Sequence, residues 1–587
     1  MMKKILLVLL VPLLAATAVA EPLALDWKCG AHSVVKDNLL IVSVERNDKQ
    51  AGTEMARAEI DISPYCGKMV EIKAKCLGFD IAKAKLSHHG SKLMLHYRDL
   101  DTNRDEWPQA GTVIGTFGER EIKLRTYIKS KRVGKATLSF GLQFASGTFV
   151  MDLSTLEIST LELSEADAYQ VKYPKSVMEW PRMRGVMSPS KAVTEDDMKT
   201  LQKWGANLLR FQMNRGWGAK NANRDIEDYM KWFEGRLDNL EQVLGWAKDC
   251  GIKVVVDLHT PAGGRGDTRE CNLFFEKKYE DCFYDCWRKI ATRFKGRPEI
   301  YGYDLINEPV QHSPTACDYM TLQRKAAEIV RAIDPDTPIV VESNEMDAPQ
   351  AFWYLKPLKM DNVIYQVHVY CPGSFTHQLG DKPKAGWNVW PDPKKGWTRD
   401  LIREELRPVR EFQRKTGCRI YVGEFSAVAW APGADAYLRD CIALFEEYGW
   451  DWSYHAFREY AGWSVEHEGE DSKSLRPAND TSRMKVLFDG FRADRALRVG
   501  RVLWYNLTDH GRTTAKCIEP RGCRLSPQVG RADCRRARHG RWRGCEGARR
   551  ARQPGDGEDF SRWKAAGGGR AQADGDALQA RRGLELD

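Results

Sequence analysis

Hydrophobic residues along this chain follow two different periods, and the change between them divides the sequence. Across residues 25–165, apolar positions alternate with polar ones, as from Val70 to Cys76 and from Leu138 to Phe144. A period of two is that of half-buried antiparallel strands, and turn residues such as Ser146-Gly147 separate the runs. Helical periodicity is absent from this region, so the pattern predicts an all-β sandwich of two sheets.

From about Tyr173 onward, short apolar runs alternate with amphipathic stretches of helix length, such as Asp238–Cys250 and Tyr319–Ile333. Eight runs are strand candidates: Met183–Val186, Asn207–Gln212, Ile252–His259, Ile300–Asn307, Pro338–Glu342, Val363–Tyr370, Arg419–Glu424 and Trp450–His455. This alternation predicts an α/β fold of the (β/α)₈ TIM barrel type. A doubly wound sheet would place a glycine-rich turn after its first strand, and none follows Val186.

The two ends of the chain differ from both regions. Lys3 and Lys4 precede an apolar run that ends in Ala18-Val19-Ala20, which is the pattern of a secretory signal peptide. The alternative, a membrane anchor, would need a longer apolar run. After about Gly490, Arg, Gly and Ala dominate and apolar periodicity is lost, so we expect disorder there. A reading-frame change in the gene is our hypothesis for this shift, and resequencing its 3′ end would test it.

These patterns predict four segments: a signal peptide (1–20), a sandwich (21–168), a catalytic barrel (169–497) and an Arg/Gly/Ala-rich tail (498–587). Hydrophobic residues make up 42% of the chain and charged residues 29%, which excludes wholesale disorder and a multi-span membrane protein. Residues 521–587 contain fifteen Arg and one Lys against six Asp and three Glu. This segment therefore supplies most of the net charge of +9. The remainder is close to neutral, so nucleic-acid binding would depend on the tail alone.

The chain has fifteen cysteines, an odd number, so at least one thiol lacks an intramolecular partner. Cys66 could pair with Cys76, and Cys271 with Cys282 or Cys286, and the sequence leaves these pairings open. None of the Cys and His spacings is that of a zinc site. Cys282 and Cys286 lie in an expected helix, where packing is favoured over metal binding.

Polar residues at the carboxyl ends of barrel strands are catalytic candidates. The expected strands place eight such residues at one mouth: Arg210, His259, Asn307, Glu308, His368, Tyr370, Glu424 and Trp452. Two carboxylates across a cleft suit cleavage of a glycosidic bond. One must be protonated to donate to the leaving oxygen, and the other must be ionised to attack the anomeric carbon.

The segments Leu305-Ile306-Asn307-Glu308-Pro309 and Val422-Gly423-Glu424-Phe425 resemble the motifs of glycoside hydrolase family 5, a family of retaining barrel enzymes. The resemblance covers about residues 173–497 and implies that Glu308 is the general acid/base and Glu424 the nucleophile. It also implies the remaining roles: Asn307 holds the sugar 2-hydroxyl, His259 lines the glycone subsite, His368 lines the side of the acid, Arg210 and Tyr370 support Glu424, and Trp452 stacks on the sugar ring. Retention is implied by the resemblance alone, since a sequence gives no distance between carboxyl groups.

Within this family the expected activity is that of a secreted, extracellular or periplasmic, endo-β-1,4-glucanase acting on cellulose-type glucans. β-Mannanase, xyloglucanase, licheninase and exo-acting β-glucosidase activities remain alternatives. A non-catalytic carbohydrate-binding protein would lack Glu308 or Glu424, and both are present. The chemistry requires no metal or organic cofactor. We expect a β-glucan polysaccharide as the substrate, a monomer, no nucleic-acid partner and no stable membrane association.

Five further features carry expectations of their own. The sandwich resembles a carbohydrate-binding module, and its candidate aromatic residues are Trp27, Tyr65, Tyr97, Trp107 and Tyr127. The alternative is a structural sandwich with Trp27 and Trp107 in its core. We expect Glu342 to form a salt bridge at the core rim, and Glu459 to be a surface carboxylate unless it reaches a sugar hydroxyl. The loop Pro261–Asp267 is a candidate for a glycone-side wall of the cleft, with a flexible barrel loop as the alternative. The tryptophans in the loops after the barrel strands are candidates for sugar platforms on the cleft walls or for structural residues: Trp217, Trp390, Trp397, Trp430 and Trp463.

Overall fold

The computed structural model of the chain describes residues 21–45, 52–86, 89–101 and 103–493. The predicted signal peptide at 1–20 and the predicted tail at 498–587 lie outside these ranges, and both stay predictions. Within the four ranges, no helix is long and apolar enough to cross a lipid bilayer.

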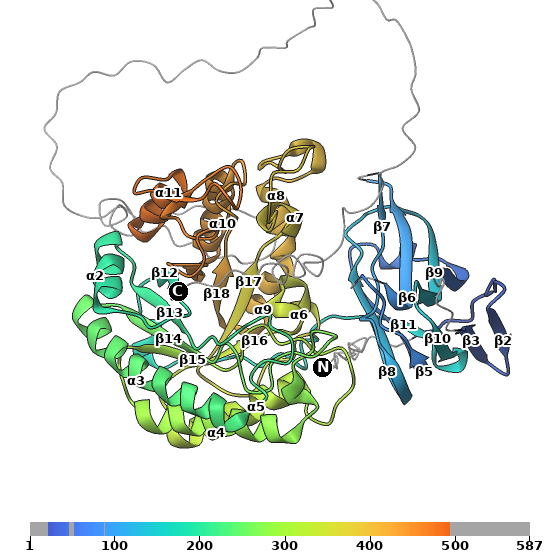
Figure 1. Cartoon of the computed structure of the whole chain (residues 1–587), viewed down its shortest axis with the longest axis horizontal. Coiled ribbons are helices and arrows are strands. Elements are labelled where there is room, and N and C mark those ends of the chain that lie inside the picture. Colours follow the sequence, from blue (N-terminus) through green and yellow to red (C-terminus); the bar gives the residue numbers. More distant parts are fainter. Residues whose placement is uncertain (1–20, 46–51, 87–88, 102, 494–587) are drawn as a thin grey trace, which may run out of the picture. The chain divides into compact units, whose positions relative to one another are not determined.

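The N-terminal region consists of two antiparallel sheets (Figure 1). The larger sheet has the order β1-β11-β5-β10-β3-β2, with β8 also paired to β5, and the smaller has the order β4-β9-β6-β7. The strands of the larger sheet are β1 (Glu21–Pro22), β2 (Ser33–Lys36), β3 (Leu39–Val44), β5 (Met69–Ile81), β8 (Gly115–Tyr127), β10 (Gly147–Asp152) and β11 (Glu157–Thr160). Those of the smaller sheet are β4 (Thr53–Ile60), β6 (Gly90–Asp99), β7 (Arg104–Glu106) and β9 (Val133–Gln143).

The period-two pattern produces the core of this sandwich. The apolar residues of β5 from Val70 to Cys76 and those of β9 from Leu138 to Leu142 are buried and form one cluster. The predicted alternation was wrong at Phe144, which is 50% exposed. β9 ends one residue earlier, at Gln143, and the backbone of Phe144 has a φ of +50°, so its side chain leaves the sheet.

The second region is a closed parallel barrel, as the sequence predicts (Figure 1). Each predicted run contributes one strand: β12 (Arg184–Met187), β13 (Leu208–Gln212), β14 (Lys253–Asp257), β15 (Ile300–Asp304), β16 (Ile339–Glu342), β17 (Val363–Val369), β18 (Arg419–Phe425) and β19 (Asp451–Tyr454). Most of these strands are buried along their whole length, as parallel strands covered by helices must be.

The helices are α1 (Lys175–Met178), α2 (Glu195–Trp204), α3 (Ile226–Cys250), α4 (Lys277–Phe294), α5 (Tyr319–Ile333), α6 (Asn344–Asp347), α7 (Gly373–Thr376), α8 (Arg399–Glu405), α9 (Arg407–Thr416), α10 (Ala434–Tyr448) and α11 (Ser482–Phe491). The bounds predicted for α5 are confirmed. α3 begins twelve residues before the predicted Asp238, because the Asp225 side chain accepts the Asp228 N–H and caps the helix there. A short hairpin of β20 (His467–Glu468) and β21 (Arg476–Pro477) follows β19.

Each cysteine in the described ranges is a free thiol, so neither the Cys66–Cys76 pairing nor a pairing of Cys271 forms there. Cys282 and Cys286 are buried one turn apart on α4. Their sulfur atoms lie 3.6 and 3.8 Å from the sulfur of Met230 on α3, a packing contact between two helices.

The interior of the barrel is built in layers. Near the amino ends of the strands, a buried apolar cluster fills the interior: Met183, Leu208, Val255, Tyr301, Val340, Ile364 and Tyr421. Side chains alternate between the two faces of a strand, so the residues two positions further on point into the same interior. These are Arg210, Asp257, Glu342 and Gln366 on four of the strands, and Gly423 on β18. A Cβ atom at Gly423 would lie 2.4 Å from the Gln366 side chain, so this position has room only for glycine.

Candidate active site

Arg210 lies at the centre of the polar layer, fully buried at the carboxyl end of β13. Its Nη1 donates to Glu424 Oε1 at 2.7 Å and its Nε to Asp304 Oδ2 at 2.9 Å. Its Nη2 donates to Glu342 Oε1 at 2.9 Å and lies 3.3 Å from Asp257 Oδ2. One guanidinium therefore contacts four buried carboxyl groups, and it compensates the charge of those that are ionised.

The pKa values of two of these four carboxyl groups are raised. Burial raises the pKa of Asp304 to about 6, although Arg210 opposes the shift. Burial together with the nearby Asp304 raises the pKa of Glu342 well above its usual range. A protonated Glu342 competes little for the guanidinium charge, so more of that charge acts on Glu424.

Glu424 is the carboxyl group that the surroundings keep ionised. Tyr370 Oη donates to its Oε2 at 2.8 Å, while Arg210 contacts the other oxygen. The His368 Nδ1 atom lies 3.7 Å from Oε2. Burial alone would raise the pKa of Glu424, but His368, His455 and Arg210 outweigh burial and hold that pKa far below its usual range.

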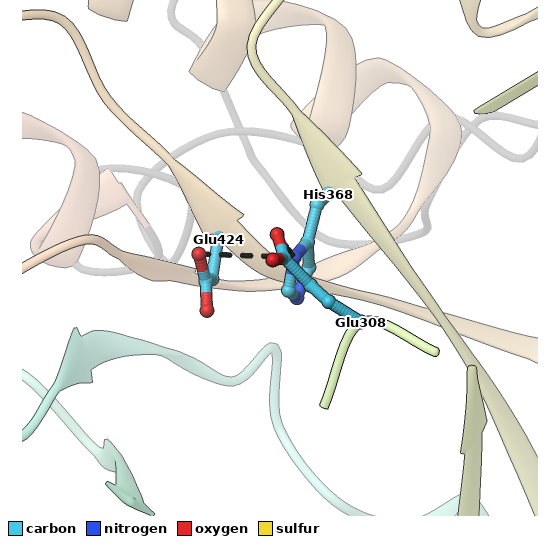
Figure 2. Close-up of side chains that lie close together, drawn as sticks. All are labelled: Glu308, His368 and Glu424. Atoms are coloured by element: carbon cyan, nitrogen blue, oxygen red, sulfur yellow. Dashed lines mark hydrogen bonds and ion pairs between the residues drawn. The ribbon is translucent and has the colours of Figure 1, made fainter. Parts of the chain in front are cut away.

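Glu308 follows β15 and faces Glu424 across the barrel mouth. Its Oε1 is 2.9 Å from His368 Nδ1, and Figure 2 shows the His368 ring beside the Glu308 carboxyl group. One oxygen of Glu308 and one of Glu424 lie within 4.8 Å of each other. Glu308 has a φ of +49°, an unfavourable backbone conformation for a glutamate, and its N–H donates to Glu342 Oε2 at 2.6 Å. Glu342 thus holds the backbone of Glu308 in place.

Asn307 and His259 border the same mouth. Asn307 Oδ1 accepts from Arg210 at 3.0 Å, and its Nδ2 lies 3.2 Å from His259 Nε2. His259 Nδ1 lies 2.8 Å from Asp257 Oδ2, which fixes the orientation of the ring. A small pocket extends from Asn307 and His259 to Trp217 and Arg265.

Two loops form this pocket, one after β13 and one after β14. Arg265, in the predicted wall segment Pro261–Asp267, donates to the Glu308 carbonyl oxygen at 2.6 Å and lies 5.6 Å from the Trp217 ring centroid. The Asn221 N–H donates to the Arg265 carbonyl, which joins the two loops. The Trp217 Nε1–H is buried and has no hydrogen-bond partner among the described residues. Trp217 and Arg265 therefore line the pocket beside the two candidate sugar-binding residues.

Seven of the eight residues selected from the sequence lie together, and Trp452 does not. Its indole is fully buried on the outer side of β19 and stacks on Phe491 of α11 at 5.3 Å between ring centroids. Its Nε1 donates to Glu446 of α10 at 2.9 Å. The prediction that Trp452 stacks on a sugar ring is therefore wrong, because Asp451 and Ser453 are the residues of this strand that face the interior.

The tryptophans of the loops divide between the cleft and the core. Trp217 lines the pocket. Trp463 is 9% exposed and packs 6.1 Å from Tyr370 and 5.7 Å from His455 between ring centroids. Trp390 and Trp430 are buried, and their N–H groups donate to Asp440 and to the Gln378 carbonyl.

Sequence reasoning missed the contacts of Asp257 and Asp304 with Arg210, and it missed His455. The expectation that Glu459 is a surface carboxylate was wrong, because its side chain is 17% exposed and contacts His455 Nε2 at 2.9 Å. Asp257 and Asp304 end β14 and β15, whereas the predicted runs continued to His259 and Asn307. Glu342 forms a salt bridge as expected, but it lies under the site at 0% exposure and not at the core rim. Side chains at every second position of β19 face the interior, and His455 continues the series of Asp451 and Ser453. The same rule applied to the sequence would therefore have selected His455 in place of Trp452.

Two groups of side chains have the composition of a metal site: Glu308 with His368 and Glu424, and Glu342 with Asp347 and His368. In each group the candidate ligand atoms lie within 4.8 Å of one another. However, Arg210 contacts both Glu424 and Glu342 at hydrogen-bond distance. A cation at either position would be repelled by the guanidinium, so the donor sets fit hydrogen bonding better than metal binding.

On the sandwich, Trp107 is the exposed member of the five candidate aromatic residues, at 53% exposure. Its ring stacks on His96 at 3.7 Å with an interplanar angle of 15°. Asp105 fixes His96 at 3.2 Å and pairs with Arg98 at 2.6 Å. Tyr97 is buried, and Trp27 packs against the core. The alternative that placed Trp107 in the core is therefore wrong.

A (β/α)₈ barrel with two facing carboxyl groups at the carboxyl ends of its strands is an arrangement that suits glycoside hydrolysis. The family model Cellulase (glycosyl hydrolase family 5) matches residues 167–461, and the chain belongs to this family. The chain is thus a glycoside hydrolase, as its resemblance to the family implies.

Several characterised proteins are similar to this chain. Endoglucanase C of Acetivibrio thermocellus is 26% identical over 299 residues, which cover 45% of this chain and 84% of the relative. Cellodextrinase A of Ruminococcus flavefaciens is 27% identical over 257 residues, covering 42% of this chain and 71% of the relative. Among solved structures, the endoglucanase Cel5A of Thermotoga maritima is 20% identical, with 53% of this chain and 97% of that chain covered and a TM-score of 0.41.

Proposed function

We propose that this protein is a secreted, retaining endo-β-1,4-glucanase in which Glu424 is the nucleophile and Glu308 the general acid/base. The observation that carries the proposal is the placement of an ionised Glu424 with one oxygen within 4.8 Å of a Glu308 oxygen. Retaining glycosidases hold their two carboxyl groups ~5–5.5 Å apart, whereas inverting enzymes leave ~6.5–9.5 Å for a water molecule. The short separation supports retention.

In the first step, Glu424 attacks the anomeric carbon while Glu308 protonates the leaving oxygen, which gives a covalent glycosyl-enzyme. In the second step, Glu308 takes a proton from water, and the hydroxide oxygen displaces Glu424 to release the sugar. His368 occupies Glu308 Oε1 at 2.9 Å, which leaves Oε2 for the transferred proton. Arg210 and Tyr370 stabilise the charge of Glu424 before the attack and again when it leaves.

The sugar-binding roles follow from the same geometry. Asn307 is positioned by Arg210 and holds the 2-hydroxyl, and His259 lines the glycone side. A β-glucan substrate is supported by the names of two relatives, Endoglucanase C and Cellodextrinase A.

The sandwich is part of this proposal as a carbohydrate-binding domain that uses Trp107. Its ring is held rigid by His96 and is 53% exposed, which suits stacking against a sugar. Export is supported by the charged and apolar pattern of residues 3–20.

The first experiment measures reducing-sugar release from carboxymethylcellulose together with the fall in viscosity, with Glu424→Ala as the control. An endo-acting enzyme lowers viscosity well before many reducing ends appear, and Glu424→Ala should abolish both signals. A folded protein that releases no sugar from this polymer, but cleaves mannan, xyloglucan, mixed-linkage glucan or aryl β-glucosides, would replace the proposed substrate by that alternative.

The roles are tested separately from the substrate. Proton NMR of the first product should show the β-anomer, since retention preserves configuration. Glu308→Ala should lower kcat on unactivated substrate by about 10²–10⁴-fold, with less effect on aryl glycosides whose leaving groups need no proton. Azide should rescue Glu424→Ala as an α-glycosyl azide and Glu308→Ala as a β-glycosyl azide. The opposite products would exchange the two roles, and an α-anomer released by the wild type would refute retention.

A further inference from the structure

A chain of hydrogen bonds extends from the candidate nucleophile to a carboxylate outside the eight residues selected from the sequence. Tyr370 Oη lies 2.8 Å from Glu424 Oε2 and 2.6 Å from His455 Nδ1. On the other side of the ring, His455 Nε2 lies 2.9 Å from Glu459 Oε2. The order is therefore Glu459, His455, Tyr370, Glu424, from three different strand ends.

The number of available protons fixes the direction of these bonds. A phenol has one proton, and Tyr370 donates it to Glu424, whose carboxylate can only accept. His455 Nδ1 must then be the donor to Tyr370 Oη. The Glu459 carboxylate likewise accepts, so Nε2 is also a donor. Both ring nitrogens of His455 carry hydrogen, which makes the ring an imidazolium.

The surroundings of His455 favour that charge. Glu424 Oε2 of β18 lies 3.6 Å from Nδ1, Glu459 comes from the loop after β19, and Glu308 faces the ring from the end of β15. Burial opposes the charged form, but these three carboxyl groups outweigh it and raise the pKa of His455.

The other titratable groups nearby are two histidines and Tyr370. His377, which follows α7, packs on Tyr370 at 4.8 Å between ring centroids, and burial together with His455 lowers its pKa to about 4, so it stays neutral. His368 of β17 contacts Glu308 and Glu424 on the far side of the site. Burial and Glu424 raise the pKa of Tyr370 well above its usual range, so its hydroxyl keeps the proton that it donates.

We propose that His455 and Glu459 are positioning residues that hold the Tyr370 hydroxyl on Glu424, and that loss of one proton from His455 turns this hydroxyl away. A neutral His455 keeps Nε2–H on Glu459 and exposes the lone pair of Nδ1, 2.6 Å from Tyr370 Oη. That lone pair competes for the single phenol proton. Glu424 then loses one of its two side-chain donors, and attack on the anomeric carbon slows.

This inference rests on the proposed role of Glu424 as the nucleophile. It adds an alkaline limit to activity that is set by the proton of His455 and not by that of Glu308. The two limits separate on 2,4-dinitrophenyl β-cellobioside, because this leaving group needs no protonation and ionisation of the acid has little effect on its departure. The alkaline limb of kcat/KM for glycosylation then reports the groups around Glu424.

The variant to compare with the wild type is Glu459→Gln, which keeps an acceptor for Nε2–H and removes the charge. We expect its alkaline limb to move to lower pH by about one unit. The matched control is Glu468→Gln on β20, an exposed carboxylate paired with Arg476, and its profile should coincide with that of the wild type. In a Tyr370→Phe background, Glu459→Gln should cause no further shift, because the pair acts through the hydroxyl.

An unmoved alkaline limb in Glu459→Gln, or a shift that persists in Tyr370→Phe, overturns the proposal. A direct measurement covers the case in which the wild type does not cleave this cellobioside. In the full-length protein labelled with ¹³C at histidine Cε1, the resonance missing from His455→Asn identifies His455. We expect a doubly protonated ring at pH 7 in the wild type and a lower midpoint in Glu459→Gln. A His455 ring that is neutral at pH 7 refutes the positioning role. If His455 titrates as expected but the wild type does not cleave the cellobioside, only the proposed substrate is refuted.

Discussion

Replacement of Trp452 should lower the stability of the barrel and leave substrate binding intact. The indole is 0% exposed, stacks on Phe491 at 5.3 Å and meets the edge of Phe425 at 5.7 Å between ring centroids. Truncation of a buried tryptophan to alanine costs about 3–5 kcal/mol in the free energy of unfolding. The lost donor to Glu446 adds about 1 kcal/mol at most, because that carboxylate keeps Arg184 at 2.8 Å.

Trp452→Phe is the milder perturbation, since it keeps most of the apolar contacts and removes the N–H. We expect it to cost about 1–2 kcal/mol. Calorimetry should show a fall in the melting temperature of about 5–15 °C for Trp452→Ala and a smaller fall for Trp452→Phe. KM for carboxymethylcellulose should be unchanged in both variants wherever the protein is folded.

The control is Trp463→Ala, which removes a ring packed against Tyr370 and His455 at the site. This variant should lower kcat/KM more than either change at position 452. A Trp452→Ala protein with an unchanged melting temperature and a tenfold higher KM would return the indole to the cleft and refute the outward orientation.

Three further predictions test the charges of the site and the sandwich. Arg210→Met should raise the pKa of Glu424, shift the acid limb of kcat/KM to higher pH and cost about 3–5 kcal/mol of stability. Arg210→Lys should show smaller effects of the same kind. An unmoved acid limb would contradict the role of the guanidinium. Burial raises the pKa of Asp347 to about 8, so its neutral form stabilises the fold and that stability is lost as pH rises through this value. Asp347→Asn should therefore flatten the decline of melting temperature between pH 5 and pH 8. If the melting temperature of this variant fell with pH as steeply as that of the wild type, a group other than Asp347 would be the one that loses its proton. Trp107→Ala should weaken retention on insoluble cellulose by roughly two- to tenfold and leave hydrolysis of soluble substrate unchanged. Phe144→Ala, which removes another exposed aromatic side chain of the sandwich, should leave both retention and hydrolysis unchanged.

The periodicity of the sequence was sufficient to predict the strands. Each predicted run of the barrel became one strand, because parallel strands covered on both faces must be apolar along their length. The ends of those runs identified seven residues that the structure brings together. A strand end is a local feature, and the barrel gathers the carboxyl ends of its strands at one mouth.

Errors arose where the side of a strand mattered. Trp452 was selected for its chemistry, although the parity that places Asp451 and Ser453 inside the barrel places Trp452 outside. The same parity leads to His455. The shared contact of four carboxyl groups with Arg210 could not be predicted in this way, because the groups come from four strands and meet only after the barrel closes.

The surroundings of the two glutamates support their different roles independently of the family resemblance. Glu424 accepts from Arg210 and Tyr370 and faces two histidines, so three kinds of donor or positive charge stabilise its ionised form. The Glu308 carboxyl group contacts His368, and among the described residues no arginine or lysine reaches it. When the two glutamates hold one proton between them, placing that proton on Glu308 therefore costs less free energy than placing it on Glu424. A nucleophile must be ionised and an acid must hold a proton, so this asymmetry supports the proposal that Glu424 attacks and Glu308 protonates.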